Sequence, residues 1–200
     1  MTALAFLRPS GGAVARSPME RQALAAGARF EVRDGWNVAV SFGDDSRDAP
    51  VRWADVSHLP KIEVHGHHEL ALGQATRTNG AWRCPVTRDR TLVIGDRDAD
   101  GVDLTSALAA LSVSGPLARE VFARFCALDL RPQSVPVGGF RPGSVARTPG
   151  YVLREDDDRF LMLFGWALGE YMWTVVSDAA GALGGAPVGV DALDRQAARA

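Results

Sequence analysis

Apolar and polar residues alternate along the first half of the chain with the two-residue period of a half-buried strand. The alternation runs over residues 30–32, stops at Asp34-Gly35, and resumes from 36 to 42. An Asp-Gly pair favours the positive φ angles of a tight turn, so the pattern predicts a β-hairpin with one apolar face. Ahead of it, the capping box Ser17-Pro18-Met19-Glu20 predicts a short helix over 18–26.

The second half combines strand-like runs with helical spacing. An apolar strand is predicted over 108–113, and the segment that opens at Pro116 predicts an amphipathic helix. Strands at 144–153 and 159–164, a helix at 167–183 and an edge strand at 187–190 complete the series. This order of strand, helix, strand, strand, helix and strand is that of a ferredoxin-like α+β unit.

These elements divide the chain into four parts, and the expected fold class is α+β. Residues 1–16 show no sustained period and are expected to form an N-terminal arm that lies on a partner. Residues 17–101 form a first α+β half and residues 102–190 the ferredoxin-like second half. Residues 191–200 are expected to form a C-terminal tail.

Composition narrows the range of partners and locations. Of the 200 residues, 46% are apolar, which is enough for a globular core, and the formal charge is only −2. No strong positive field exists, so neither nucleic acid nor an anionic membrane is an expected partner. Cys84 and Cys126 are far apart and belong to no metal-binding motif, and no apolar stretch suits a signal peptide or a membrane span. The expected location is the cytoplasm.

One stretch carries most of the functional information, namely residues 53–64, Trp-Ala-Asp-Val-Ser-His-Leu-Pro-Lys-Ile-Glu-Val. Together with 17–19 and 27–36 it resembles the start of the glycine-cleavage T-protein (aminomethyltransferase) family. A second block, from Val102 to Gly189, continues the resemblance. Within this superfamily the chain is similar to the sarcosine oxidase gamma subunit family. The resemblance implies a truncated aminomethyltransferase-type folate-binding fold.

The resemblance stops at the parts that carry folate chemistry. In the aminomethyltransferases a longer segment between the two blocks supplies an Asp that meets the folate, whereas residues 66–101 are short and offer no assignable Asp. Those proteins also continue past the Pro-Val-Gly turn with a pterin-contacting Glu and a C-terminal barrel, which residues 190–200 do not resemble. The resemblance therefore assigns no catalytic residue to this chain.

What the resemblance implies is a non-catalytic, gamma-type subunit of a multi-subunit sarcosine- or dimethylglycine-type amine oxidase or dehydrogenase. Flavoprotein and folate-binding subunits would be its partners. FAD and possibly tetrahydrofolate would belong to the complex and no cofactor to this chain alone, which has no dinucleotide-binding fingerprint. The alternatives are a compact tetrahydrofolate-dependent aminomethyl transferase and a stand-alone folate-fold protein in iron–sulfur metabolism.

A metal site is the first local alternative. Glu63, His65 and His67 would share one face of a continuing strand, a spacing that suits a divalent cation. Gly66 interrupts that strand and His68 falls in a polar turn, so a solvated turn is the preferred interpretation and no metal site is expected.

Two further patterns contain catalytic or phosphate-binding residue types. Asp55, Ser57 and His58 have the composition of a hydrolytic triad, but neighbours in sequence are more typical of a capped turn before Pro60. The glycine-rich run 138–143 lacks the Lys-Ser/Thr ending of a phosphate loop, which favours an ordinary loop.

Two tryptophans are the candidates for a partner interface. Trp166 and Trp173 fall partly off the apolar stripe of the predicted 167–183 helix, whereas Tyr171 belongs to it. Tryptophan is enriched at interface hot spots. We therefore expect Trp166 and Trp173 to remain exposed in the isolated chain and to lie on a partner surface.

Overall fold

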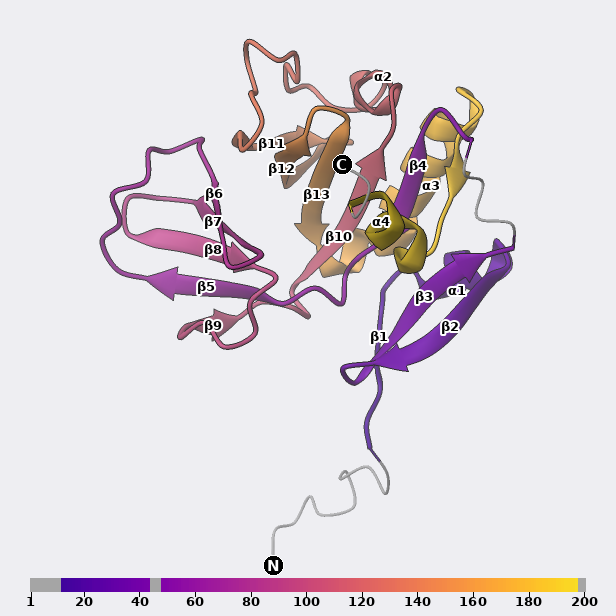
Figure 1. Cartoon of the computed structure of the whole chain (residues 1–200), viewed down its shortest axis with the longest axis horizontal. Coiled ribbons are helices and arrows are strands. Elements are labelled where there is room, and N and C mark those ends of the chain that lie inside the picture. Colours follow the sequence, from indigo (N-terminus) through magenta and orange to yellow (C-terminus); the bar gives the residue numbers. More distant parts are fainter. Residues whose placement is uncertain (1–11, 44–47, 198–200) are drawn as a thin grey trace, which may run out of the picture.

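A six-stranded mixed sheet lies at the centre of the computed structural model, which describes residues 12–43 and 48–197 (Figure 1). The strand order is β11-β12-β13-β10-β4-β14, and every neighbouring pair is antiparallel except β4 and β14. The strands are β4 (Arg52–Asp55), β10 (Leu108–Ser114), β11 (Phe140–Val145), β12 (Thr148–Asp156), β13 (Arg159–Gly165) and β14 (Ala186–Pro187).

Helices cover one face of this sheet. Residues of α1, α2 and α3 share a core with the side chains of Phe160, Met162 and Phe164 on β13 and of Leu111 and Val113 on β10. A short 3-10 helix, η2, leads from β13 into α3. The bounds are α1 (Glu20–Ala25), α2 (Ala118–Ala123), η2 (Trp166–Leu168) and α3 (Gly169–Gly181).

Two smaller sheets and the C-terminal helix cover the opposite face. Leu161 and Leu163 of β13 pack in a second core with Val38 of β3, Trp82 of β7 and Leu193 of α4. The three-stranded sheet has the order β1-β3-β2 and the five-stranded sheet the order β6-β7-β8-β5-β9. The bounds are β1 (Ala15–Arg16), β2 (Ala28–Arg33), β3 (Trp36–Phe42), β5 (Lys61–His65), β6 (Thr76–Thr78), β7 (Ala81–Pro85), β8 (Arg90–Ile94), β9 (Val102–Asp103) and α4 (Val190–Ala197).

Several sequence predictions are confirmed. The α+β class holds, and β2 and β3 form the predicted hairpin, with positive φ at Asp34 (49°) and Gly35 (78°). The three predicted helices exist with shorter bounds, as α1, α2 and α3. No helix among the described residues is long and apolar enough to cross a membrane.

The ferredoxin-like second half is not confirmed as a unit of its own. Strands β12, β13 and β10 are neighbours in the order that such a unit requires. However, β4 from the first half lies between β10 and β14, because β4 pairs with β10 over Arg52–Asp55 and with β14 at Ala186 and Pro187. The predicted boundary between residues 101 and 102 thus separates β4 from β10, although the two strands pair in one sheet. The division into four parts stays a prediction.

The strand predicted at 144–153 is wrong, since the chain reverses direction inside it. Strand β11 ends at Val145, β12 begins at Thr148, and the turn between them has positive φ at Ala146 (48°) and Arg147 (62°). This turn escapes a sequence pattern because neither residue is Gly, Asn or Asp. Strand β11 also includes part of the run 138–143 that the sequence indicates as a loop.

Both chain ends differ in part from expectation. The predicted N-terminal arm contributes β1, which pairs parallel with β3 at Trp36 and Asn37, while residues 1–11 lie outside the described residues. The predicted tail forms α4 over Val190–Ala197 and packs against β3 and β4. The predicted edge strand is β14, displaced to Ala186–Pro187.

Replacing Trp173 tests the assignment of this residue to the core. Its side chain is 6% exposed and packs in the helix-side core, so Trp173→Ala removes a large aromatic from a close-packed interior. We expect the free energy of unfolding to fall by about 3–5 kcal/mol in denaturant titration. Thr174→Ala, on the exposed side of the same helix, is the control and stays within about 0.5 kcal/mol. Equal midpoints for both variants would contradict the assignment.

Candidate functional site

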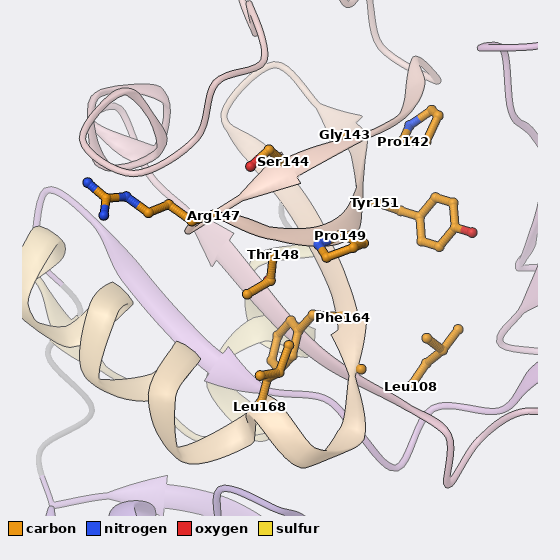
Figure 2. A pocket seen from close by; sticks show the side chains of 12 residues that line it. Leu108, Pro142, Gly143, Ser144, Arg147, Thr148, Pro149, Tyr151, Phe164 and Leu168 are labelled. Atoms are coloured by element: carbon orange, nitrogen blue, oxygen red, sulfur yellow. The ribbon is translucent and has the colours of Figure 1, made fainter.

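A pocket of about 790 Å³ opens where β12 and β13 separate (Figure 2). The last pair between these strands is Gly150 with Phe164, so Thr148 and Pro149 extend beyond the end of the pairing. Strand β13 ends at Gly165, and the backbone N–H of the next residue, Trp166, donates to Ala107 O at 2.9 Å. The pocket is lined by Leu108, Pro142, Gly143, Ser144, Arg147, Thr148, Pro149, Gly150, Tyr151, Phe164, Gly165 and Leu168.

The lining is apolar with few polar groups. Tyr151 stands at one side of the pocket and stacks on Phe140 with ring centroids 5.2 Å apart and planes at 8°. The Thr148 hydroxyl donates to Val145 O at 2.9 Å. Arg147 is the one charged lining residue in the described part of the chain, and Figure 2 shows its guanidinium pointing away from the apolar side chains. The pocket suits an apolar group, and within residues 12–43 and 48–197 no carboxylate, imidazole or thiol lines it.

The segment 53–64 folds into a buried polar bracket between β4 and β5. Asp55 accepts the Ser57 N–H at 3.0 Å, and the Ser57 hydroxyl accepts the Ala110 N–H at 3.1 Å. The fully buried Lys61 ammonium donates to Ser57 O at 2.9 Å and to Leu59 O at 2.7 Å. Asp55 and Lys61 thus bond backbone groups of their own turn, and the Ser57 side chain bonds the backbone of β10. These bonds give the sequence motif a structural role.

Burial shifts the pKa values of the ionisable groups in this bracket. It raises the pKa of Asp55, against hydrogen bonds from Ser17 and Ser57. It lowers the pKa of Lys61 to about 8, although Asp55 and Asp103 favour the ammonium form. The pKa of His58 falls to about 4, first through burial and then through the charges of Lys61 and Arg33. His58 is therefore neutral at pH 7.

The histidine cluster does not converge on a cation site. His65 Nε2 lies 2.7 Å from the Glu63 carboxylate, while His68 Nε2 lies 2.6 Å from Thr87 O on another turn. Within residues 12–43 and 48–197, no three His, Cys, Asp or Glu side chains are grouped so that they could hold a metal ion.

The glycine-rich run 138–143 leads into strand β11, and its polar groups bond to neighbouring segments of the backbone. The Gly138 N–H donates to Arg154 O at 2.8 Å, and Phe140 N–H donates to Gly73 O at 3.0 Å. The Arg141 guanidinium donates to Ser134 O at 3.1 Å. These bonds occupy the groups that a phosphate loop would offer to a ligand.

The two tryptophans occupy different environments, and the expected exposure of Trp173 is wrong. Trp173 stacks with Phe42 and meets Trp53 edge-on, with ring centroids 6.2 Å apart in both pairs. Helical spacing alone could not show that β3 and β4 deliver aromatic side chains to this side of α3. Trp166 is half-buried and packs against both cores. Its ring meets that of Trp36 edge-on, with ring centroids 5.8 Å apart.

The sequence did not indicate the pocket at all. Its residues come from β10, β11, β12, β13 and η2, so they converge only when the sheet is assembled. The closest available signal is Pro149-Gly150, because Pro lacks the N–H that a strand ladder requires.

No protein-family model matches this sequence, and no curated protein matches it. The fold, however, is similar to solved structures. A chain of the heterotetrameric sarcosine oxidase from Corynebacterium sp. U-96, in complex with pyrrole 2-carboxylate, matches with a TM-score of 0.66 and 17% identity. The match covers 86% of this chain and 97% of that one.

The glycine cleavage system aminomethyltransferase T from Bartonella henselae also matches, with a TM-score of 0.70 and 16% identity. That match covers 90% of this chain but only 60% of the aminomethyltransferase. The chain therefore has the aminomethyltransferase-type fold, and it spans about three fifths of the length of that relative.

The pKa of His58 predicts a pH dependence of stability. Its folded value of about 4 lies below its ordinary value of 6.5, so the fold favours the neutral ring. This contribution is complete above pH 6.5 and is lost as the pH falls toward 4. When the pH falls from 7 to 4.5, the free energy of unfolding decreases in the wild type partly because of His58. In His58→Gln this decrease should be smaller by about 2 kcal/mol.

The exposed His67 supplies the control for this measurement. His67→Gln keeps the buried imidazole and should follow the wild-type pH profile in denaturant unfolding. Identical profiles for wild type and His58→Gln would show that the His58 ring is not held in its neutral form.

Proposed function

We propose that this chain is a non-catalytic, gamma-type subunit of an amine-oxidising complex of the sarcosine or dimethylglycine kind. The observation that carries the proposal is the match over 97% of a chain from a heterotetrameric sarcosine oxidase. By contrast, 40% of the aminomethyltransferase chain lies outside the match, which covers the other 60%. The match thus covers a larger share of the oxidase chain than of the transferase chain.

The chemistry of the pocket supports the same proposal. General acid or base catalysis needs a titratable group within hydrogen-bond reach of the reacting atom. Among the residues that the structure describes, the titratable groups lining the pocket between β12 and β13 are the Arg147 guanidinium and the Tyr151 phenol, without a carboxylate, imidazole or thiol. The Cys126 thiol borders a different hollow, and burial raises its pKa, which disfavours the nucleophilic thiolate. In this proposal FAD, and possibly tetrahydrofolate, belong to the flavoprotein and folate-binding subunits.

Native mass spectrometry of the chain purified from its own host tests the proposal directly. We expect a hetero-oligomer that contains a flavoprotein, with the flavin on that partner. The chain freed from its partners should show neither a flavin spectrum nor tetrahydrofolate-dependent demethylation. One-carbon transfer by the pure chain would overturn the non-catalytic role in favour of a compact transferase.

Trp166 is the tryptophan that we retain as an interface candidate. It is half-buried at the junction of the two cores, so part of its ring is open to a partner. We expect Trp166→Ala to weaken assembly by about 2 kcal/mol in a titration of the purified complex. Because Trp166 also packs on Trp36, the folding midpoint is measured in parallel.

Val102→Ala is the control for that titration, because Val102 is a 55% exposed apolar residue at the edge of the five-stranded sheet. It should assemble with wild-type affinity. Wild-type affinity for a folded Trp166→Ala variant would remove Trp166 from the interface.

A further inference from the structure

A second hollow lies across the Ala146–Arg147 turn from the apolar pocket. Its volume is about 360 Å³, and Phe125, Cys126 and Val175 are among the residues that line it. Arg147 lines both hollows, so the turn forms the ridge between them. In Figure 2 the Arg147 guanidinium extends away from the apolar pocket.

The ridge has a backbone conformation that its residues rarely adopt. Ala146 and Arg147 have φ angles of 48° and 62°, and both carry a Cβ. The surrounding structure holds them in place: Ala146 N–H donates to Phe125 O at 2.9 Å, and the Tyr171 hydroxyl donates to Ala146 O at 3.1 Å. A strained turn persists where its neighbours determine it, and such turns gather at binding sites. Here the turn presents Arg147 at the surface.

The second hollow has an unbalanced positive charge. Arg124 and Arg147 are its charged lining residues, and both are exposed. Neither has an ion-pair partner among the residues that the structure describes. By comparison, Arg131 pairs with Asp129 at 2.7 Å. Each guanidinium carries a fork of N–H donors that matches a carboxylate, and both residues line the same hollow.

We propose that these two hollows together bind an extended acidic segment of a partner protein. A carboxylate of that segment would lie between Arg124 and Arg147, and an apolar side chain would fill the pocket across the turn. This inference rests on the proposed function, since it specifies the chemistry of the partner.

Two features favour a protein segment over a small molecule. An occupant of both hollows has to cross the turn at the exposed Arg147, and an extended chain does this while placing every second side chain on the same side. In addition, Pro142 of the edge strand β11 and Pro149 of β12 cannot donate to a new strand. Recognition would therefore depend on side chains and charge instead of strand addition.

The probe is a random-peptide phage library selected on the immobilised full chain. We expect enriched peptides with Asp or Glu close to an aromatic or aliphatic residue. A synthetic copy of the best peptide should bind at least about tenfold more tightly than its Asn/Gln analogue, because a charge-assisted pair is lost in the analogue. Enrichment without acidic residues would overturn the proposal.

Charge reversal locates the site. The double variant R124E/R147E should bind the selected peptide at least about tenfold more weakly. R83E, which makes the same change at an exposed position on β7, should bind like the wild type. If R124E/R147E unfolds, R124Q/R147Q takes its place and should also lose binding. Wild-type affinity in a folded double variant would overturn the proposal.

Two further arms separate this proposal from its alternatives and from the proposed function. 4-Phenylbutyrate is titrated as a free amphipathic carboxylate, and binding as tight as that of the peptide would assign the site to a small molecule. The double variant is then carried through purification from the host. A complex that forms with R124E/R147E as it does with the wild type overturns this inference alone, whereas absence of any complex for the wild type overturns the proposed function.

Discussion

Burial of the central sheet on both faces is the constraint on which the rest of the molecule depends. In β13, Leu161, Met162, Leu163 and Phe164 are all at most 1% exposed, and alternate residues enter opposite cores. Both faces must be covered to keep such a strand from water. Helices cover one face, and the smaller sheets with α4 cover the other. Strand β4, placed between β10 and β14, joins the two halves of the chain into this one arrangement.

The polar bracket after β4 follows from the same constraint. The chain has to leave the buried sheet and turn toward β5, and backbone groups in that turn would otherwise be buried without partners. Lys61 supplies an ammonium group to two carbonyl oxygens, and Asp55 and Ser57 accept backbone N–H groups. The polar residues that look most catalytic in the sequence therefore stabilise a buried crossing between sheets.

The apolar pocket lies at the β11–β12 edge of the same sheet. There β12 outlasts its pairing with β13, which leaves the apolar pocket, and the strained turn beside it carries Arg147. The segment from β11 to η2 and the end of α2 contribute an apolar hollow, a half-buried Trp166 and two guanidinium groups that have no ion-pair partner among the described residues. Such a combination of aromatic and arginine side chains is typical of protein interfaces.

The sequence by itself determined those features that depend on neighbours along the chain. The hairpin at Asp34-Gly35 and the three helices of the two halves follow from local turn chemistry and apolar period, and the α+β class follows from their order. The family resemblance extended this to the aminomethyltransferase-type fold, as the structural matches bear out.

Only the tertiary structure decided which side chains are buried and where a pocket opens. Trp173 is enclosed because Phe42 and Trp53, more than a hundred residues earlier, pack against it. The Ala146–Arg147 turn contains none of the residues that usually form such turns. Its hydrogen bonds with Phe125 and Tyr171, which are distant in sequence, compensate the backbone strain. The pocket arises from the divergence of two strands in an assembled sheet. These features depend on contacts between residues far apart in sequence, which a local pattern of polar and apolar positions does not contain.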